Sequence, residues 1–168
     1  MEATDILRDI FGRSRKAIAP LLELSDAELY VEPLPSIAWH AWRMGRLLDY
    51  NISGLMQTGQ LWTDEHWHLR FDMGPELEDF LPGFPPPNDI VWTFHSASAQ
   101  LLLDYFDAAF ERTMGYIATL SAADLDRVLG EPQYGTPPTV SVRLVSVGVA
   151  LAQSSGPIRY RLWFASNS

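Results

Sequence analysis

The sequence of 168 residues contains no cysteine, which excludes disulfide bonds, thiolate nucleophiles and zinc sites built from cysteine. Any metal ion would have to be held by histidine and carboxylate side chains. Basic residues are also few, with 12 lysines and arginines against 21 aspartates and glutamates, so the net charge is −9 at pH 7. A chain of this charge repels a phosphate backbone, and we therefore expect no nucleic-acid partner.

Long apolar runs are missing as well. No stretch of the sequence approaches the ~18 apolar residues that a membrane-spanning helix needs. The first residues, MEATDILRDIFGRSRK, carry charges throughout and lack the apolar run of a signal peptide. We therefore expect a cytoplasmic protein with no membrane partner, and the lack of cysteine fits a reducing compartment.

Motifs that mark several enzyme classes are also absent. The chain has no phosphate-binding glycine loop, no dinucleotide-binding fingerprint and no H-E-x-x-H metal motif. The run Ser154, Ser155, Gly156 lacks the G-x-S-x-G frame of a nucleophile elbow. No pair of acidic residues stands out as a general acid and base. We leave enzymatic activity uncertain and lean toward none.

The chain does contain enough apolar material for one packed domain over residues 1–168, with 47% hydrophobic residues. In several stretches the apolar residues recur every three or four positions, which is the pattern of one face of an α-helix. Glycine and proline interrupt a long connection over residues 57–95, in which we expect short helices over 60–70 and around 76–81. Long helices are expected over residues 4–24, 36–55, 96–120 and 139–164.

The last of these stretches is ambiguous from periodicity alone. Its valines fit a buried strand nearly as well as a helix; they are Val140, Val142, Val145, Val147 and Val149. A lone strand would have nothing to pair with, because no second strand candidate exists elsewhere. We therefore predict a helix here and an all-α fold of the bundle type.

Cap signals mark the helix boundaries. Ser25 and Ser121 each begin a capping-box pattern that should start a short helix, and Ser36 can cap the second long helix. Pro20 removes a backbone donor and should bend the first helix or end it early, and Pro157 should kink the last one.

Two stretches resemble the DinB-like superfamily, which includes the YfiT-type and mycothiol-dependent maleylpyruvate isomerase proteins. The first is Ser36-Ile37-Ala38-Trp39 with the helix that follows it through Arg46 and Asp49, and the second is Gly156-x-Ile158-Arg159-Tyr160. The resemblance implies a four-helix bundle in up-down-down-up order, with helices two and three parallel and joined by a long crossover containing short helices. It also implies a homodimer, since members of this family are often dimeric, and the small residues of the last helix would suit such a contact.

The same resemblance implies a divalent metal held by three histidines, one on the second helix and two on the fourth. The matching positions in this sequence are Arg43, Ala150 and Ser154, and none of them is histidine. Arginine cannot coordinate a cation, alanine has no ligand atom, and one serine hydroxyl is a poor ligand. We therefore expect a degenerate metal site and no cofactor.

Arg43 must still find a partner if it faces the interior, because an unpaired buried charge costs several kcal/mol. One interpretation is an internal ion pair with Glu65, Asp64 or Asp49. The other is a pocket that binds a small carboxylate or another anion. The residues of this candidate pocket are His40, Arg43, Gln153, Ser154 and Trp39, with Trp42 nearby.

His66 and His68 offer a relocated metal site as a further alternative. Two positions apart on a helix they would point about 200° apart, but on an extended loop they could share an ion with Asp64 or Glu65. Otherwise they are surface or packing residues.

We therefore expect a metal-free, non-catalytic DinB-like protein that binds a small anionic ligand in the former metal-site cavity. The alternatives are a metal- and thiol-dependent transferase or isomerase with a relocated metal, or a structural homodimer module.

Overall fold

In the computed structural model, residues 2–30, 35–75, 94–95, 97–130 and 138–165 are described, and these segments are mainly helical. Their only extended pairing is an isolated bridge between Val128 and Thr139. The all-α prediction is confirmed, including the helical assignment of the valine-rich last stretch. The four long helices are α1 (Ala3–Ile18), α3 (Ile37–Met56), α7 (Ala99–Thr119) and α9 (Val140–Ala165).

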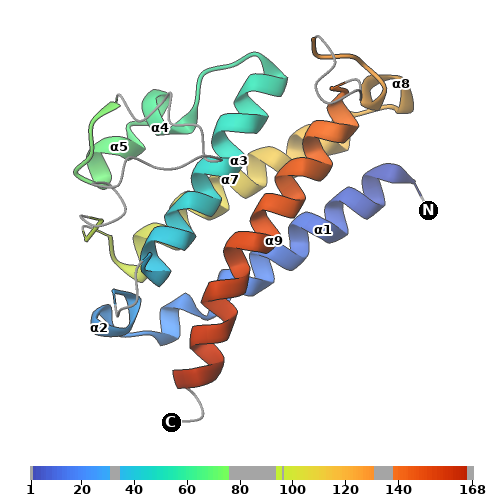
Figure 1. Cartoon of the computed structure of the whole chain (residues 1–168). Coiled ribbons are helices and arrows are strands. Elements are labelled where there is room, and N and C mark those ends of the chain that lie inside the picture. Colours follow the sequence, from blue (N-terminus) through green and yellow to red (C-terminus); the bar gives the residue numbers. More distant parts are fainter. Residues whose placement is uncertain (1, 31–34, 76–93, 96, 131–137, 166–168) are drawn as a thin grey trace.

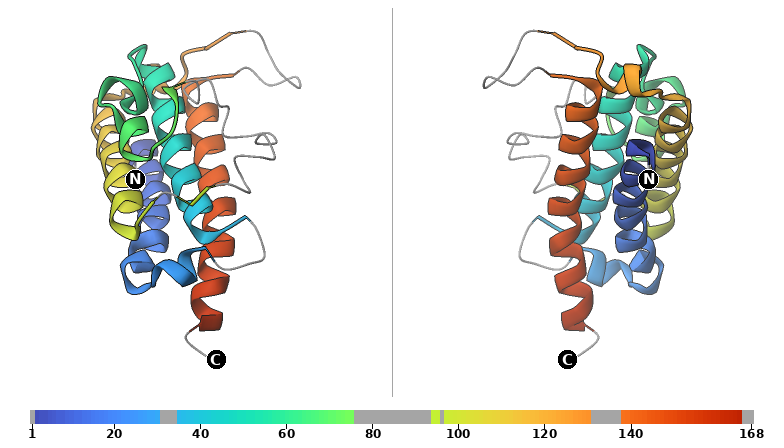
Figure 2. Two further views of the ribbon diagram at one scale, coloured as in Figure 1. Left: turned by 90° about the vertical axis from the view of Figure 1, so that its left-hand side faces the viewer. Right: turned by 90° about the vertical axis from the view of Figure 1, so that its right-hand side faces the viewer.

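Contacts between the long helices define their directions (Figure 1). Arg46 contacts Tyr105, and Thr58, just beyond α3, contacts Arg112, so residue numbers on α3 and α7 rise together and the two helices are parallel. Contacts from α3 to α9 run in the opposite order, because Arg43 meets Ser154 whereas Asn51 meets Arg143. Figure 2 shows the same up-down-down-up bundle from two sides, which confirms the predicted order of the helices.

The short elements follow the cap signals. Helix α1 gives way to a 3-10 helix at Ala19–Glu23, which carries Pro20, and α2 (Asp26–Leu29) follows. The predicted capping boxes form at Ser25 and at Ser121, which begins α8 (Ala122–Leu125). The Ser36 side chain accepts a hydrogen bond from the Trp39 backbone N–H, at 3.1 Å, and so caps α3.

The crossover differs from its prediction. A single helix was expected over residues 60–70, but two short helices form, α4 (Leu61–Asp64) and α5 (Trp67–Arg70). His66 separates them, since its φ of 56° is left-handed and cannot continue a right-handed helix. The helix expected around 76–81 lies outside the described residues. Helix α7 begins at Ala99 with Ser98 as its cap, three residues later than predicted.

The core of the bundle centres on α3, most of whose residues are buried. Trp42, Met44 and Leu48 have no exposed surface. Buried side chains of α1, α7 and α9 join the same hydrophobic cluster. Within the described part of the chain, no helix is both long enough and apolar enough to cross a membrane.

Gly45 lies at the closest approach of α3 to α7. A Cβ atom at this position would come within 2.8 Å of the Tyr105 ring, and Tyr105 is held in place by hydrogen bonds to Asp49 and Arg46. We expect Gly45→Ala to reduce the free energy of unfolding by about 1–3 kcal/mol, as overpacking typically does.

Gly54 provides the matched control for this substitution. It lies on the same helix with nothing within 4 Å of an added Cβ atom. Gly54→Ala should therefore raise the free energy of unfolding by about 0.5–1 kcal/mol through helix propensity. Urea denaturation measures both; equal effects of the two substitutions would contradict the close approach.

Candidate functional site

Arg43 lies in the first half of α3, is half-buried and reaches toward α9. Its guanidinium donates a hydrogen bond to the Ser154 hydroxyl, and its central carbon lies 5.8 Å from the centroid of the Trp39 ring. Trp39 and Arg43 are four positions apart, so the two side chains lie one above the other on the helix. His40 packs edge-on against Trp39, with the ring centroids 5.1 Å apart.

Ser154 completes the contact from the α9 side. Its side chain is 2% exposed, and its hydroxyl donates to the Ala150 carbonyl oxygen at 3.0 Å while accepting from Arg43. The three positions that the family resemblance assigns to metal ligands, 43, 150 and 154, therefore converge in space. They form a direct chain from guanidinium to hydroxyl to backbone carbonyl.

These residues do not fit a metal ion. The guanidinium has five N–H groups and no lone pair to donate, Ala150 offers only a carbonyl oxygen that is already engaged, and the Ser154 hydroxyl is held by two hydrogen bonds. A cation placed here would also meet the fixed positive charge of Arg43. No metal-dependent step can be derived at this position from the side chains present.

The charged groups around this site are positive. Burial, together with the charges of Arg43 and Arg161, lowers the pKa of His40 from 6.5 to about 4. Burial also lowers the pKa of Arg43, although arginine stays charged at neutral pH. The neutral imidazole is thus within electrostatic range of two guanidinium groups. Arg161 was missed from the sequence, although it lies seven positions after Ser154 and therefore on the same side of α9.

The internal ion pair considered for Arg43 does not form within the described segments. Asp49 pairs with Arg46 instead, and Glu65 accepts a hydrogen bond from the Trp67 indole at 3.3 Å. Asp64 makes no ion pair with Arg43 in these segments either.

Two buried polar atoms beside Arg43 also lack partners. Neither the Trp39 indole Nε1 nor the His40 Nδ1 has a hydrogen-bond partner among the residues that the structure describes. A buried polar group without a partner costs about 1–3 kcal/mol. Among the described residues, each of these two buried atoms therefore lacks the hydrogen bond that would offset the cost of its burial.

The other two pocket candidates lie elsewhere. Gln153 is exposed, and no contact of its side chain with the Arg43 group is found in the described segments, so its part in the site stays a prediction. Trp42 is fully buried and packs against Trp62 and Phe94, with ring centroids 5.8 and 5.3 Å away, which is core packing.

His66 and His68 lie close together, with ring centroids 6.0 Å apart. His68 is buried, and its Nδ1 lies 2.8 Å from the Trp62 carbonyl oxygen, whereas His66 is exposed. Over the described part of the chain, no group of three or more histidine or acidic residues could hold a metal ion. The packing role considered for His68 matches this contact.

A buried polar network joins α3, α7 and the start of the crossover. The Asp49 carboxylate accepts hydrogen bonds from the Leu61 and Trp62 backbone N–H groups, both at 2.8 Å, and from the Tyr105 hydroxyl at 2.9 Å. It also accepts from Arg46 at 3.3 Å and from Ser53 at 3.2 Å. Arg46 is fully buried, and its guanidinium carbon lies 4.8 Å from the Trp62 ring centroid.

This network anchors the crossover and is separate from the Arg43 group. The spacing of Arg46 and Asp49, three positions apart in an apolar helix, is the signal in the sequence that points to it. The backbone donors of the crossover leave no such signal.

The outer face of α9 carries exposed valines at Val142, Val145 and Val149, which are 39%, 48% and 53% exposed. Val145 and Val149 line a groove of about 410 Å³ between α1 and α9, together with Gly148 and Gly156 among others. The homodimer stays a prediction, because nothing in the structure indicates what covers this face.

The depressed pKa of His40 predicts a pH dependence of folding. Between the ordinary histidine pKa of 6.5 and the folded value of about 4, the unfolded chain binds more protons, so protonation favours unfolding as the pH falls. We expect His40→Gln to lose less stability than the wild type between pH 6.5 and pH 4. Urea denaturation across this range measures the difference. The exposed His95 serves as control, and a His95→Gln variant with the same flattening would contradict the assignment.

Removing the charge of Asp49 tests the anchoring network. Asp49→Asn replaces one accepting oxygen with an NH₂ group that faces the existing donors. We expect a loss of about 3–5 kcal/mol in the free energy of unfolding, as for other broken buried ion pairs. Asp107, which pairs with Arg15 on a partly exposed surface, is the control, and Asp107→Asn should cost about 0–1 kcal/mol. Similar losses for both variants in urea denaturation would contradict the network.

Comparison with known proteins identifies the family. A family model of the DinB superfamily matches residues 10–147. A crystal structure described as the conserved protein of locus from Enterococcus faecalis is similar with a TM-score of 0.84 and 28% sequence identity, over 96% of this chain and 95% of that one. No curated protein matches the chain. The sequence motifs, the up-down-down-up bundle and the family model agree, and the chain belongs to the DinB superfamily.

Proposed function

We propose that this chain binds a small organic carboxylate at Arg43 and that it does so without a catalytic metal ion. The observation that carries the proposal is a charged arginine paired with a neutral hydroxyl, Ser154, beside two buried polar atoms without partners, Trp39 Nε1 and His40 Nδ1.

The donors at this position favour an anion. The guanidinium presents N–H groups in a planar fork that matches a carboxylate, and the Trp39 indole adds an N–H donor. The neutral His40 can supply a third donor in the tautomer that protonates Nδ1. A ligand carboxylate would satisfy all three groups, whereas a cation would meet only positive charge.

The proposal is one of binding rather than catalysis. Ser154 donates to a backbone carbonyl and accepts from a guanidinium, so no base is placed to activate it as a nucleophile. His40 remains neutral at pH 7, and within the described segments the charges that act on it come from arginines and not from a carboxylate that would orient it.

A test substitutes Arg43 and measures binding of benzoate by isothermal titration calorimetry. Loss of a charge-assisted hydrogen bond costs about 1.5–3 kcal/mol, so we expect Arg43→Gln to weaken binding by tenfold or more. The control is Arg70→Gln, because Arg70 also lies over a tryptophan, with its guanidinium carbon 4.1 Å from the Trp67 centroid. Neutral benzamide should bind more weakly than benzoate to the wild type. Unchanged affinity in Arg43→Gln would exclude this site.

The metal content of the purified protein tests the second half of the proposal. We expect far less than one zinc or nickel ion per chain after dialysis, because the side chains at positions 43, 150 and 154 cannot hold a metal ion. One ion per chain that disappears on substitution of His66 and His68 would instead support the enzyme with a relocated metal.

A further inference from the structure

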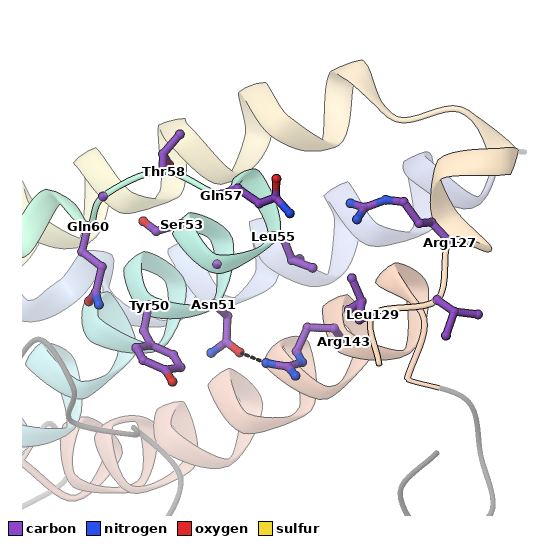
Figure 3. A pocket seen from close by; sticks show the side chains of 13 residues that line it. Tyr50, Asn51, Ser53, Leu55, Gln57, Thr58, Gln60, Arg127, Leu129 and Arg143 are labelled. Atoms are coloured by element: carbon purple, nitrogen blue, oxygen red, sulfur yellow. Dashed lines mark hydrogen bonds between the residues drawn. The ribbon is translucent and has the colours of Figure 1, made fainter. Parts of the chain in front are cut away.

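A second pocket, of about 540 Å³, lies at the other end of α3 from the Arg43 group. Its walls come from the last turns of α3, the first residues of the crossover and the segment that joins α8 to α9 (Figure 3). Arg43 and Asn51, which lines the pocket, are eight positions apart on α3, which corresponds to roughly 12 Å along a helix axis. The two sites are therefore distinct.

Two arginines from different elements line this pocket. Arg127 follows α8, and Arg143 lies in the first turn of α9. Figure 3 shows both side chains reaching toward the pocket, with Leu55 and Leu129 between them. Asn51 Oδ1 accepts a hydrogen bond from Arg143 Nη1 at 3.3 Å and so orients that guanidinium.

Neither arginine forms an ion pair within the described segments. Arg127 lies near Asp124, whose pKa it helps to lower, but that carboxylate is engaged first by Ser121, from its backbone N–H at 2.8 Å and its hydroxyl at 2.6 Å. Arg143 is held by a neutral amide. Two positive charges thus face one pocket in a protein whose net charge is −9.

The end of α3 does not account for these arginines. A helix C-terminus attracts cations through its unpaired carbonyl groups. Here the chain itself satisfies two of these groups, since the Ser53 carbonyl accepts from the Thr58 N–H at 3.0 Å and the Gly54 carbonyl from the Gln57 N–H at 3.4 Å. In the described segments neither arginine donates to a carbonyl of α3.

We infer that this pocket binds a small organic dianion of the dicarboxylate type. One carboxylate would pair with Arg127 and the other with Arg143, and an apolar middle would lie on Leu55 and Leu129. Gln57 and Thr58 add polar groups at the rim for further hydrogen bonds. The volume falls within the range of about 300–1,000 Å³ that is usual for small-molecule sites.

The separation of the two guanidiniums by leucine side chains selects this ligand class. A single inorganic phosphate needs donors that converge on one point, whereas these two arginines come from different elements and the Arg143 guanidinium is turned toward Asn51 (Figure 3). A short dicarboxylate has two anionic ends joined by an apolar linker. The pocket wall presents the matching order of arginine, leucine and arginine (Figure 3).

Glutarate is a suitable probe, with binding followed by isothermal titration calorimetry and by NMR shifts of the Val128 and Leu129 amides. We expect Arg127→Gln and Arg143→Gln each to weaken glutarate binding by tenfold or more, since each removes one charged contact. Asn51→Ala should weaken it less, because Asn51 only positions Arg143. Inorganic phosphate and the uncharged diamide of glutarate should bind more weakly than glutarate.

Two controls separate this pocket from the Arg43 site. Arg8→Gln removes an exposed arginine that pairs with Asp5 on α1, and Arg43→Gln alters only the first site. Both should leave unchanged the glutarate affinity that is read from the Val128 and Leu129 amide shifts, and Arg127→Gln should leave benzoate affinity unchanged. The inference is overturned if glutarate shows no saturable binding, or if its affinity depends on Arg43 rather than on Arg127 and Arg143.

Discussion

The buried carboxylate of Asp49 is the contact on which the arrangement of this bundle depends. Parallel neighbouring helices cannot be joined by a short turn, so the chain between α3 and α7 must return along the bundle. Asp49 fixes the start of that return by accepting from the first two N–H groups of α4, and the hydroxyl of Tyr105 ties the same carboxylate to α7. A buried charge of this kind is tolerated because several donors surround it.

This anchor divides the polar residues of α3 between two sides. Arg46, Asp49 and Ser53 form the internal network toward α7 and the crossover, where Arg46 and Ser53 each donate a hydrogen bond to the Asp49 carboxylate. Arg43 and Asn51 face α9, where their partners are Ser154 and Arg143. The network toward α7 is closed and structural, whereas the contacts toward α9 involve positive groups without carboxylates in the described segments. Both proposed ligand sites lie on this second side of the helix.

Periodicity and cap residues predicted most of the fold. The apolar stripes located the four long helices, and Ser25, Ser36 and Ser121 marked helix starts correctly because capping is a local interaction. The split of the crossover helix at His66 was not predictable, since a left-handed residue other than glycine leaves no pattern. The contact partners of the candidate-site residues were harder still to predict from the sequence. Asp49 binds backbone N–H groups, which every residue type supplies, and the contact of Arg43 with Ser154 joins residues 111 positions apart.

An arginine at position 43, where the family resemblance implies a metal ligand, limits the chemistry that this position can support. A metal ion offers open coordination positions that polarise a substrate or lower the pKa of a bound water. A guanidinium offers directed N–H donors and a fixed positive charge, but no open orbital and no proton to exchange near neutral pH. Compared with a metal ion, a guanidinium therefore still attracts an anion but cannot activate a nucleophile. With Ser154 and Ala150 opposite it, the role that we propose for this position is therefore to hold a carboxylate rather than to transform it.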